Sequence, residues 1–311
     1  MTQAAESGGI LREIAAGGRV ALIRLRSMGD SVLTTPAVEL LKQARPDLEI
    51  AVVVEERFAA VFQDNPAIAK ILPPRYGELR RWRAALAVNL HGGTRSQLLT
   101  LASGARWRAG FAHHRGAALY HVKIPRAQEI LGVERTVHTA EHLASAMFYL
   151  GVPMKEVPRA SLFARPARRQ RPYAVIHPVA AAAYKTWRAD GFLRVAESLK
   201  GTGLDPVFIG AGGDDMAAFA PYETVVGQPL EDVMSLLAGA RLFVGNDSGP
   251  AHIACALGVP VVVLYGREEH RTIWAPWKPV RARTLAAESG IAGISIEEVL
   301  QAVREASRAE G

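Results

Sequence analysis

The sequence predicts a two-domain α/β protein in which each domain is built on a parallel, doubly wound sheet. Three observations support this prediction. The 311 residues suffice for two domains of ordinary size. Short apolar runs rich in β-branched residues alternate with helical patterns in both halves, which is the pattern of strands joined by crossover helices. Each half also carries a turn containing glycine and an acid directly after an apolar strand.

The first half contains four apolar runs and three helical patterns. We expect strands at 20–25, 49–54, 85–90 and around 120–124, and helices at 38–44, 97–103 and 139–150. Pro36 predicts a kink or a late start in the helix that follows the first strand, because proline lacks an N–H and its ring clashes with the preceding turn. The stretch 165–172, rich in arginine and proline, marks the domain boundary. The predicted domains are therefore 1–165 and 166–311.

The second half repeats the scheme. We expect strands at 173–176, 206–209, 224–226, 242–245 and 261–264, with helices near 192–200, 230–237 and 251–257. An amphipathic stretch at 296–306 predicts a terminal helix, and the sequence leaves open whether it packs back on the N-terminal domain. Both halves are thus predicted to be Rossmann-like.

The composition excludes several classes of protein. Hydrophobic residues make up 49% and charged residues 22% of the chain, as in ordinary globular proteins, and no apolar run reaches the roughly 18 residues that span a bilayer. The first 18 residues include Glu6 and Glu13 and do not read as a secretory signal, so we expect a cytoplasmic location. Cys255 is the only cysteine, and we expect it to pack in the core.

The net charge of +7 is unevenly distributed. Residues 1–165 hold 22 Lys and Arg against 14 Asp and Glu, whereas residues 166–311 hold 15 against 16. The N-terminal half therefore carries the whole positive excess. An anionic partner of that half is indicated, and nucleic acid, an acidic membrane surface and a phosphorylated glycolipid all qualify, as does a merely solvated basic surface.

The first turn contains Asp30 in the sequence Ser27-Met28-Gly29-Asp30. It lacks the glycine spacing of a dinucleotide-binding loop, and no Gly-Lys-Ser/Thr phosphate loop occurs in the chain. The simplest role of Asp30 is a helix N-cap. Alternatively, a carboxylate kept ionised by the helix dipole could accept a proton from an attacking hydroxyl.

The second turn, at 245–252, ends a strand and opens a helix. Ser248 is a natural N-cap, and we expect the backbone N–H groups of Gly249 and its successors to be free to bind an anion. Asp247 would repel phosphate and suits the hydroxyls of a sugar, while His252 could donate to phosphate or pack.

Two further residues follow strands in the second half. Lys185 could neutralise a diphosphate leaving group or lie on the surface. Asp214 could contact a ribose or belong to a polar turn. No Asp-x-Asp, His-Glu-x-x-His or clustered metal ligands occur, so we expect no metal in the reaction.

Several motifs together resemble glycosyltransferase family 9, the lipopolysaccharide heptosyltransferases. The resemblance covers most of residues 19–275 and rests on five segments in the family's order and spacing. These are 22–37, 53–58, 89–96, His177-Pro178 with Lys185 and Trp187, and 245–252. It implies a GT-B architecture, two Rossmann-like domains facing across a cleft, with no cofactor and an inverting, metal-independent transfer of heptose from ADP-heptose. The acceptor implied is the anionic inner core of lipopolysaccharide, Kdo-lipid A or a heptosylated form, at the inner face of the inner membrane.

The resemblance also implies roles for individual residues. Asp30 is the general base. The donor-binding residues are Lys185, Asp247, Ser248, Gly249 and His252, and the acceptor-side residues are Arg57, Arg95 and His138. Asp214 joins the predicted donor-binding residues from its place after the strand 206–209 and not from the resemblance. The loop 179–183 departs from the family because it lacks the usual glycine and hydroxyl residues, although backbone N–H groups can replace them.

Alternatives remain open. The chain could be another sugar-nucleotide enzyme of this architecture, with a different donor or epimerase chemistry, or a non-catalytic two-domain binding protein. A nucleic-acid partner is disfavoured because the basic charge is accompanied by no helix-turn-helix, zinc-finger or aromatic RNA-binding pattern.

Overall fold

A computed structural model describes residues 9–307 of the chain. The chain divides between Phe163 and Ala164 into two compact units, which are treated separately below. Within residues 9–307, no helix combines the length and the apolar character needed to cross a membrane.

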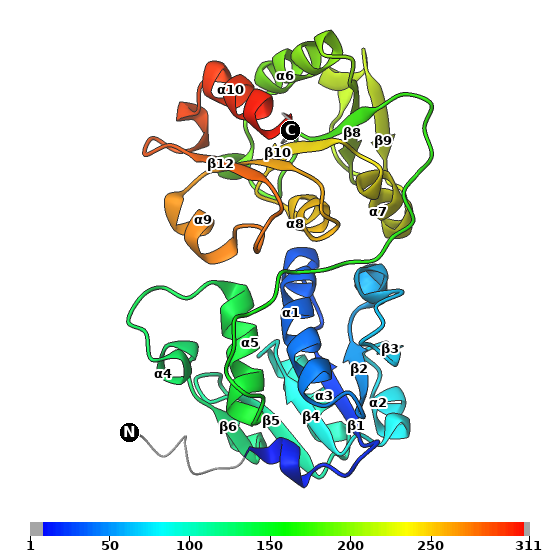
Figure 1. The fold of residues 1–311 in the computed structure, drawn as a ribbon, viewed down its shortest axis with the longest axis vertical. Helices are drawn as coiled ribbons and strands as arrows, with labels where there is room; N and C mark the ends of the chain where they lie inside the picture. The colour runs from blue at the N-terminus through cyan, green and yellow to red at the C-terminus, as the bar shows by residue number, and fades with distance from the viewer. Residues whose placement is uncertain (1–8, 308–311) are drawn as a thin grey trace. The chain divides into compact units, whose positions relative to one another are not determined.

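The N-terminal unit is built on a sheet of six parallel strands in the order β3-β2-β1-β4-β5-β6 (Figure 1). The strands are β1 (Arg19–Ile23), β2 (Glu49–Val53), β3 (Lys70–Leu72), β4 (Leu86–Asn89), β5 (Trp107–Phe111) and β6 (Val122–Ile124). The helices are α1 (Met28–Ala44), α2 (Tyr76–Trp82), α3 (Thr94–Ala102), α4 (Ala127–Leu131) and α5 (Thr139–Leu150). Helices α1 and α5 pack against each other, while Leu79 of α2 and Leu99 of α3 join a core cluster with alternate residues of β1 and β2. Helices therefore enclose the central strands, as parallel sheets require.

The C-terminal unit repeats this topology, with six parallel strands in the order β12-β11-β10-β7-β8-β9. The strands are β7 (Tyr173–His177), β8 (Asp205–Gly210), β9 (Glu223–Val226), β10 (Leu242–Asn246), β11 (Val261–Tyr265) and β12 (Ala282–Ala286). The helices are α6 (Ala189–Gly201), α7 (Leu230–Ala238), α8 (Gly249–Ala256), α9 (Glu268–Trp274) and α10 (Ile296–Ser307). Figure 1 shows α6 and α10 on one face of the sheet and α7, α8 and α9 on the other. The predicted α/β class with two doubly wound parallel sheets is confirmed.

The terminal helix α10 packs within the C-terminal unit. Val299, Ala302, Val303 and Ala306 belong to the same buried cluster as Val195 of α6 and the inward residues of the central strands. Cys255 is also buried, at 1% exposure, as expected for a core residue.

Three strands were not predicted. Strands β3 and β12 lie at sheet edges, and β12 is only partly buried along its length, so neither shows an apolar run. Strand β5 contains Arg108 and Gly110, which interrupt its pattern. Gly110 is required there, because a Cβ atom would lie 2.4 Å from the Tyr120 ring. The ring takes the space that a side chain would otherwise fill.

Pro36 predicted a kink or a late start of the helix; the late start is wrong, because α1 begins at Met28 and Pro36 lies inside it. Proline at this position cannot donate to the carbonyl of Val32, four residues earlier. The hydroxyl of Thr35 donates to that carbonyl oxygen at 2.9 Å in the buried interior. The neighbouring threonine thus satisfies the acceptor that the proline leaves, which allows the helix to continue.

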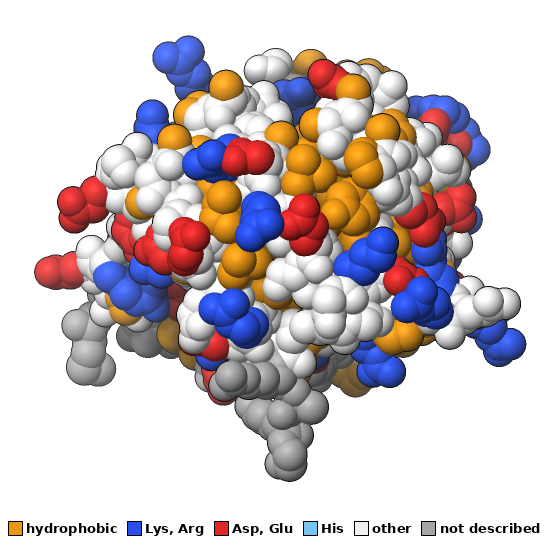
Figure 2. Space-filling model, turned by 90° about the horizontal axis from the view of Figure 1, so that it is seen from above, with side chains coloured by type: hydrophobic (Ala, Val, Ile, Leu, Met, Phe, Trp, Pro, Cys, Tyr) orange, Lys and Arg blue, Asp and Glu red, His pale blue; other side chains and the backbone are white. Residues whose placement is uncertain are grey.

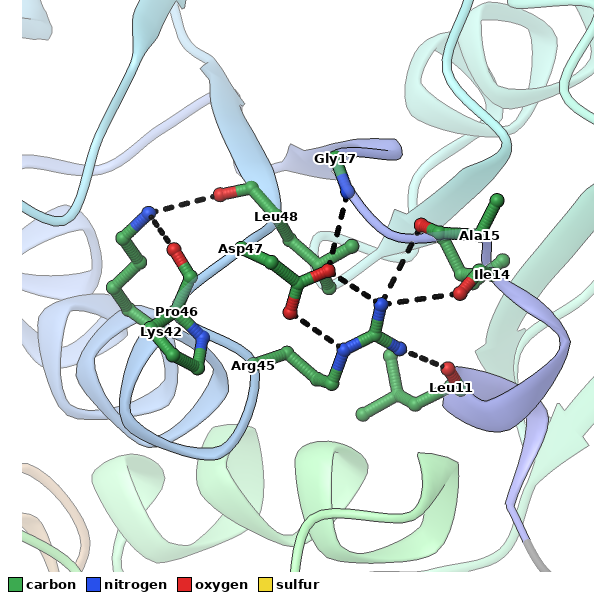
Figure 3. A network of polar contacts seen from close by, with 9 residues as sticks. All are labelled: Leu11, Ile14, Ala15, Gly17, Lys42, Arg45, Pro46, Asp47 and Leu48. Carbon is green, nitrogen blue, oxygen red and sulfur yellow. Dashed lines mark hydrogen bonds and ion pairs between the residues drawn. The ribbon is translucent and has the colours of Figure 1, made fainter.

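Arg45, at the end of α1, ties the start of the described chain to the turn before β2 (Figure 3). Its guanidinium donates to the carbonyl oxygens of Leu11 and Ile14, the latter at 3.1 Å, and to Asp47 at 2.7 and 2.8 Å. Asp47 in turn accepts from the Gly17 N–H at 3.2 Å. The Arg45 hydrogen bond holds the pKa of the Asp47 carboxyl well below its usual range.

Replacing Arg45 with methionine should lower the melting temperature by roughly 2–4 °C, because several backbone carbonyls lose their donor. The difference should begin to shrink as the pH falls through the ordinary Asp pKa, because Asp47 takes up a proton there in the unfolded chain but not in the fold, and it is lost completely only below the depressed pKa of the folded wild type. Thermal denaturation at pH 7 and pH 3 measures both effects. Arg12→Met, at an exposed position of the same segment, is the matched control. Equal melting temperatures for the two variants would show that the network contributes nothing.

One face of the molecule carries positive and negative side chains interspersed, with apolar side chains between them (Figure 2). Large exposed apolar residues within 9–307 include Tyr76, Tyr184 and Trp274, which come from three different elements. Because positive and negative side chains alternate across the face in Figure 2, this face carries no extended patch of charge of a single sign.

Candidate active site

Each sheet changes direction of winding at one point, between β1 and β4 in the N-terminal unit and between β7 and β10 in the C-terminal unit. Loops that leave adjacent strands in opposite directions open a crevice at the carboxyl edge, where ligands of such sheets bind. Asp30 follows β1, while Lys185 follows β7 and Asp247 follows β10. Asp30, Lys185 and Asp247 therefore lie at the switch points of their own units, whereas Asp214 follows β8, one strand away from the switch point.

Asp30 is the third residue of α1 and is ion-paired. Its Oδ2 atom lies 2.5 Å from Nη2 of Arg24 and accepts from the Ser27 hydroxyl at 3.2 Å. Ser27, not Asp30, occupies the N-cap position, so the simple cap interpretation is wrong. The carboxylate is 26% exposed and lies in the first turn of the helix, where the dipole favours negative charge. It is thus a fixed, partly accessible anion.

Arg24 was not predicted as a site residue. Its side chain is 11% exposed and crosses the switch point, because Nη1 donates to the Leu90 carbonyl after β4 at 2.6 Å. Its Nε atom is buried and has no partner among the described residues. Burial together with the charge of Arg24 lowers the pKa of the neighbouring His91. A charged residue inside an apolar strand pattern was the available signal, since a buried charge needs a partner.

The predicted acceptor-side residues divide into two groups. Arg57 and Arg95 meet at Glu55, with contacts to its two carboxylate oxygens at 2.9 and 3.4 Å. Both guanidinium groups are more than half exposed, so they can reach an external anion. His138 instead caps α5. Its Nδ1 atom accepts from the Ala140 N–H at 3.1 Å, and its side chain is buried.

Lys185 and Asp247 form an ion pair across the switch point of the C-terminal unit. The Nζ–Oδ2 distance is 2.7 Å, and the side chains are 23% and 7% exposed. We predicted that both residues face a donor. The structure adds that they contact each other directly. The pair holds the lysine at the carboxyl edge, and a ligand that binds Asp247 through hydroxyl groups would also meet the ammonium group.

Asn246 fixes the loop that carries Lys185. Its fully buried amide accepts from the Trp187 N–H at 3.1 Å and donates to the Pro178 carbonyl at 2.9 Å. One side chain thereby clamps both ends of the loop. Between the clamps, the backbone N–H groups of residues 179–183 make no hydrogen bond within the described chain. A row of free donors beside Lys185 is the backbone arrangement that binds phosphate oxygens.

The helix start at Gly249 offers fewer free N–H groups than expected. Pro250 has none, and the Ala251 N–H donates to the Ser248 carbonyl at 3.2 Å, which leaves the Gly249 N–H without a partner among the described residues. Ser248 stands at the N-cap, but its side chain makes no cap hydrogen bond and contacts Nδ1 of His177 at 3.0 Å. His252 is buried in the first turn and a half, at 6% exposure.

His177 is held neutral by its surroundings. Burial lowers its pKa to about 4, while the nearby Asp214 carboxylate raises it slightly. Asp214 itself closes the turn after β8, since its Oδ2 accepts from the Ala211 N–H at 2.6 Å. A neutral imidazole leaves the Ser248 hydroxyl in an uncharged hydrogen bond. Among residues 9–307, no three His, Cys, Asp or Glu side chains are grouped as metal ligands.

The neutral His177 predicts a specific pH dependence of stability. Its pKa is about 4 in the folded chain and near 6.5 when unfolded, so its contribution is complete above pH 6.5 and is lost as the pH falls toward 4. Between pH 7 and pH 4, the wild type should lose up to roughly 3 kcal/mol more unfolding free energy than His177→Asn. Urea denaturation at several pH values measures this difference. Parallel pH profiles would contradict the assignment.

The chain is similar to known proteins along most of its length. The family model described as glycosyltransferase family 9 (heptosyltransferase) matches residues 76–298. The chain is 28% identical over 294 residues to lipopolysaccharide heptosyltransferase 3 of Escherichia coli strain K12. The matched region covers 81% of this chain and 83% of that protein.

Solved structures show the same fold. A family 9 glycosyltransferase from Veillonella parvula superposes with a TM-score of 0.80 at 21% identity, covering 93% of this chain and 97% of that one. The ADP-heptose lipopolysaccharide heptosyltransferase II of E. coli has a TM-score of 0.77 at 19% identity, covering 93% and 98%. Because the family model spans more than half of the sequence, the chain belongs to glycosyltransferase family 9, the heptosyltransferases.

Proposed function

We propose that this glycosyltransferase transfers heptose from ADP-heptose to an acceptor in the inner core of lipopolysaccharide, with inversion at the anomeric carbon. Each unit supplies one observation that supports the proposal: a partly exposed, ion-paired carboxylate at the switch point of the N-terminal unit, and a lysine beside free backbone donors at the switch point of the C-terminal unit. The names of the related E. coli proteins, a lipopolysaccharide heptosyltransferase and an ADP-heptose heptosyltransferase, support the choice of donor and acceptor.

The proposed step is a single displacement. Asp30 accepts the proton of an acceptor hydroxyl as its oxygen forms a bond to the anomeric carbon of heptose, and the bond from that carbon to the diphosphate oxygen breaks. ADP leaves with the bonding electron pair. One carboxylate suffices for this reaction, because inversion needs no covalent glycosyl-enzyme.

Groups of the C-terminal unit would stabilise the departing ADP. Lys185 supplies a positive charge, and the N–H groups of 179–183 and Gly249 supply backbone donors. Asp247 would accept hydrogen bonds from heptose hydroxyls, and Asp214 would lie on the ribose side. With the lysine and these dipoles in place, the leaving group can be neutralised without a metal ion, which is the form of the reaction that we propose.

The acceptor would be held by the basic N-terminal half. Arg57 and Arg95 present exposed guanidinium groups around Glu55, and the excess of Lys and Arg in residues 1–165 favours carboxylates and phosphates. Such an acceptor is anchored in a membrane, so we propose that the protein acts peripherally at the cytoplasmic face of the inner membrane.

A donor panel tests this function. Purified protein is incubated with Kdo-lipid A or its heptosylated form and with ADP-heptose, ADP-glucose, UDP-glucose or UDP-N-acetylglucosamine, and the released nucleotide and the product mass are measured. We expect release and a heptose mass increment only with ADP-heptose. Transfer from another donor would assign a different glycosyltransferase activity, and tight ADP binding without turnover on any acceptor would favour a binding protein.

A further inference from the structure

A cavity of about 940 Å³ lies in the C-terminal unit beside the loop that carries Lys185, and it shares only Ala183 with the residues assigned above to the donor. It opens at the carboxyl ends of β11 and β12 and is bordered by the short helix Ala183–Lys185. Its walls include Tyr184, Thr186, Gly266, Arg267, Glu268 and Glu288. This volume falls in the range of small-molecule sites.

An aromatic side chain, Tyr184, lines the cavity. Tyr184 is 51% exposed. The Arg267 guanidinium lies 5.3 Å from the centre of the Tyr184 ring, and the His270 ring meets it at 6.2 Å in an edge-on arrangement. These contacts hold the ring in place while leaving part of it accessible to a ligand.

The polar groups of the cavity favour a neutral ligand rich in hydroxyl groups. Glu268 and Glu288 provide two carboxylates against the single guanidinium of Arg267 among the described lining residues. Arg271 contacts only the Oε1 atom of Glu268, so Oε2 stays available as an acceptor. Two carboxylates would repel a phosphate or a carboxylate ligand, whereas they accept hydrogen bonds from sugar hydroxyls. A pyranose ring has such hydroxyls together with a C–H face that can lie on tyrosine.

The position of the cavity fits one end of an extended ligand. The strand order β8-β7-β10-β11 places the Asp214 turn at one side, Lys185 and the start of α8 in the middle, and the cavity at the other side. With strands about 4.8 Å apart, this row spans roughly 14 Å. A nucleoside-diphosphate sugar laid along it, with its ribose toward β8 and its diphosphate at Lys185, presents its sugar toward β11.

Gly266 lines the cavity and packs closely against the segment that carries Tyr184 and Lys185. A Cβ atom at this position would lie 2.2 Å from the Tyr184 carbonyl oxygen, so only glycine allows the turn after β11 to approach the segment that carries Tyr184 and Lys185. The turn after β11 and the segment that carries Lys185 are therefore in direct contact at one wall of the cavity.

We propose that this cavity is a carbohydrate subsite in which a pyranose ring packs on Tyr184 and donates hydroxyl hydrogen bonds to Glu288 and Glu268. The inference rests on the function proposed above. The ring belongs either to the sugar of the nucleotide-sugar donor or to a sugar of the acceptor oligosaccharide, which share this chemistry.

Calorimetry on four variants tests the subsite. Tyr184→Ala and Glu288→Gln change its walls. Tyr76→Ala, at 52% exposure in the N-terminal unit, and Glu269→Gln, on α9 but outside the cavity, are matched controls. Each is titrated with ADP, with ADP-heptose and with a delipidated inner-core oligosaccharide. All four positions are exposed, and unchanged melting temperatures verify that the fold is intact.

We expect the ADP dissociation constant to stay within twofold in every variant. If the donor sugar occupies the subsite, Tyr184→Ala and Glu288→Gln weaken ADP-heptose about tenfold, and if an acceptor sugar does, they weaken the oligosaccharide instead. Wild-type affinity for both carbohydrates in both variants, with ADP still bound, would overturn the subsite alone. A wild type that binds none of the three probes would overturn the proposed function, and with it the subsite.

Discussion

Replacing Asp30 with asparagine is expected to lower kcat by about 10²- to 10⁴-fold while leaving the ADP dissociation constant nearly unchanged. Asparagine keeps the shape of the side chain but cannot accept the proton of the acceptor hydroxyl. ADP affinity should be retained because the residues proposed to hold ADP all belong to the other unit. Nucleotide release at saturating substrate and calorimetry with ADP measure the two quantities.

The variant also leaves the Arg24 charge without its partner, since the two side chains are only 2.5 Å apart. Some loss of stability is therefore expected, and ADP binding serves as the check that the fold persists. Asp64→Asn, at an exposed position of the same unit, is the matched control, and asparagine tolerates its positive φ of 56°. Turnover of Asp30→Asn within tenfold of the control would remove Asp30 from the role of general base.

Replacing Lys185 with methionine is expected to weaken ADP binding by about 10- to 100-fold and to lower kcat as well. Two effects combine in this variant. The diphosphate loses a cation, and the Asp247 carboxylate, at 7% exposure, loses its ion pair and repels the ligand. Titration calorimetry and nucleotide release measure affinity and rate.

A second variant separates these effects. Lys185→Met combined with Asp247→Asn removes the unpaired carboxylate, so ADP affinity should recover in part while kcat stays low. Lys200→Met, at an exposed position on α6, should behave as the wild type. Unchanged ADP affinity in Lys185→Met would count against any contact between this lysine and the diphosphate.

Most of the fold could be predicted from the sequence because its central strands are buried on both faces. Strand β1, for example, has four consecutive residues buried, and the apolar run that results is easily recognised. Edge strand β12 has no fully buried residue, so its sequence carries no apolar run. Strand β5 depends on Gly110 facing the ring of Tyr120, a contact with a residue that follows the strand and that no local pattern reveals.

The candidate site was predictable at the level of loops rather than of contacts. Placing Asp30, Lys185 and Asp247 after strands required only the strand positions, and the parallel topology then brought each to the carboxyl edge. Their partners depend on tertiary packing. The pairing of Asp30 with Arg24, the contact of Ser248 with His177 rather than with its own helix, and the capping role of His138 all follow from geometry that single-sequence patterns do not encode.

A crystal structure of the protein with ADP and a lipopolysaccharide acceptor fragment tests the central claim most directly. The proposed reaction predicts an acceptor hydroxyl within about 2.6–3.2 Å of an Asp30 carboxylate oxygen, with the diphosphate bound by Lys185 and the backbone N–H groups of 179–183 and Gly249. A different carboxylate at the acceptor hydroxyl, or ADP bound away from Lys185, would contradict it.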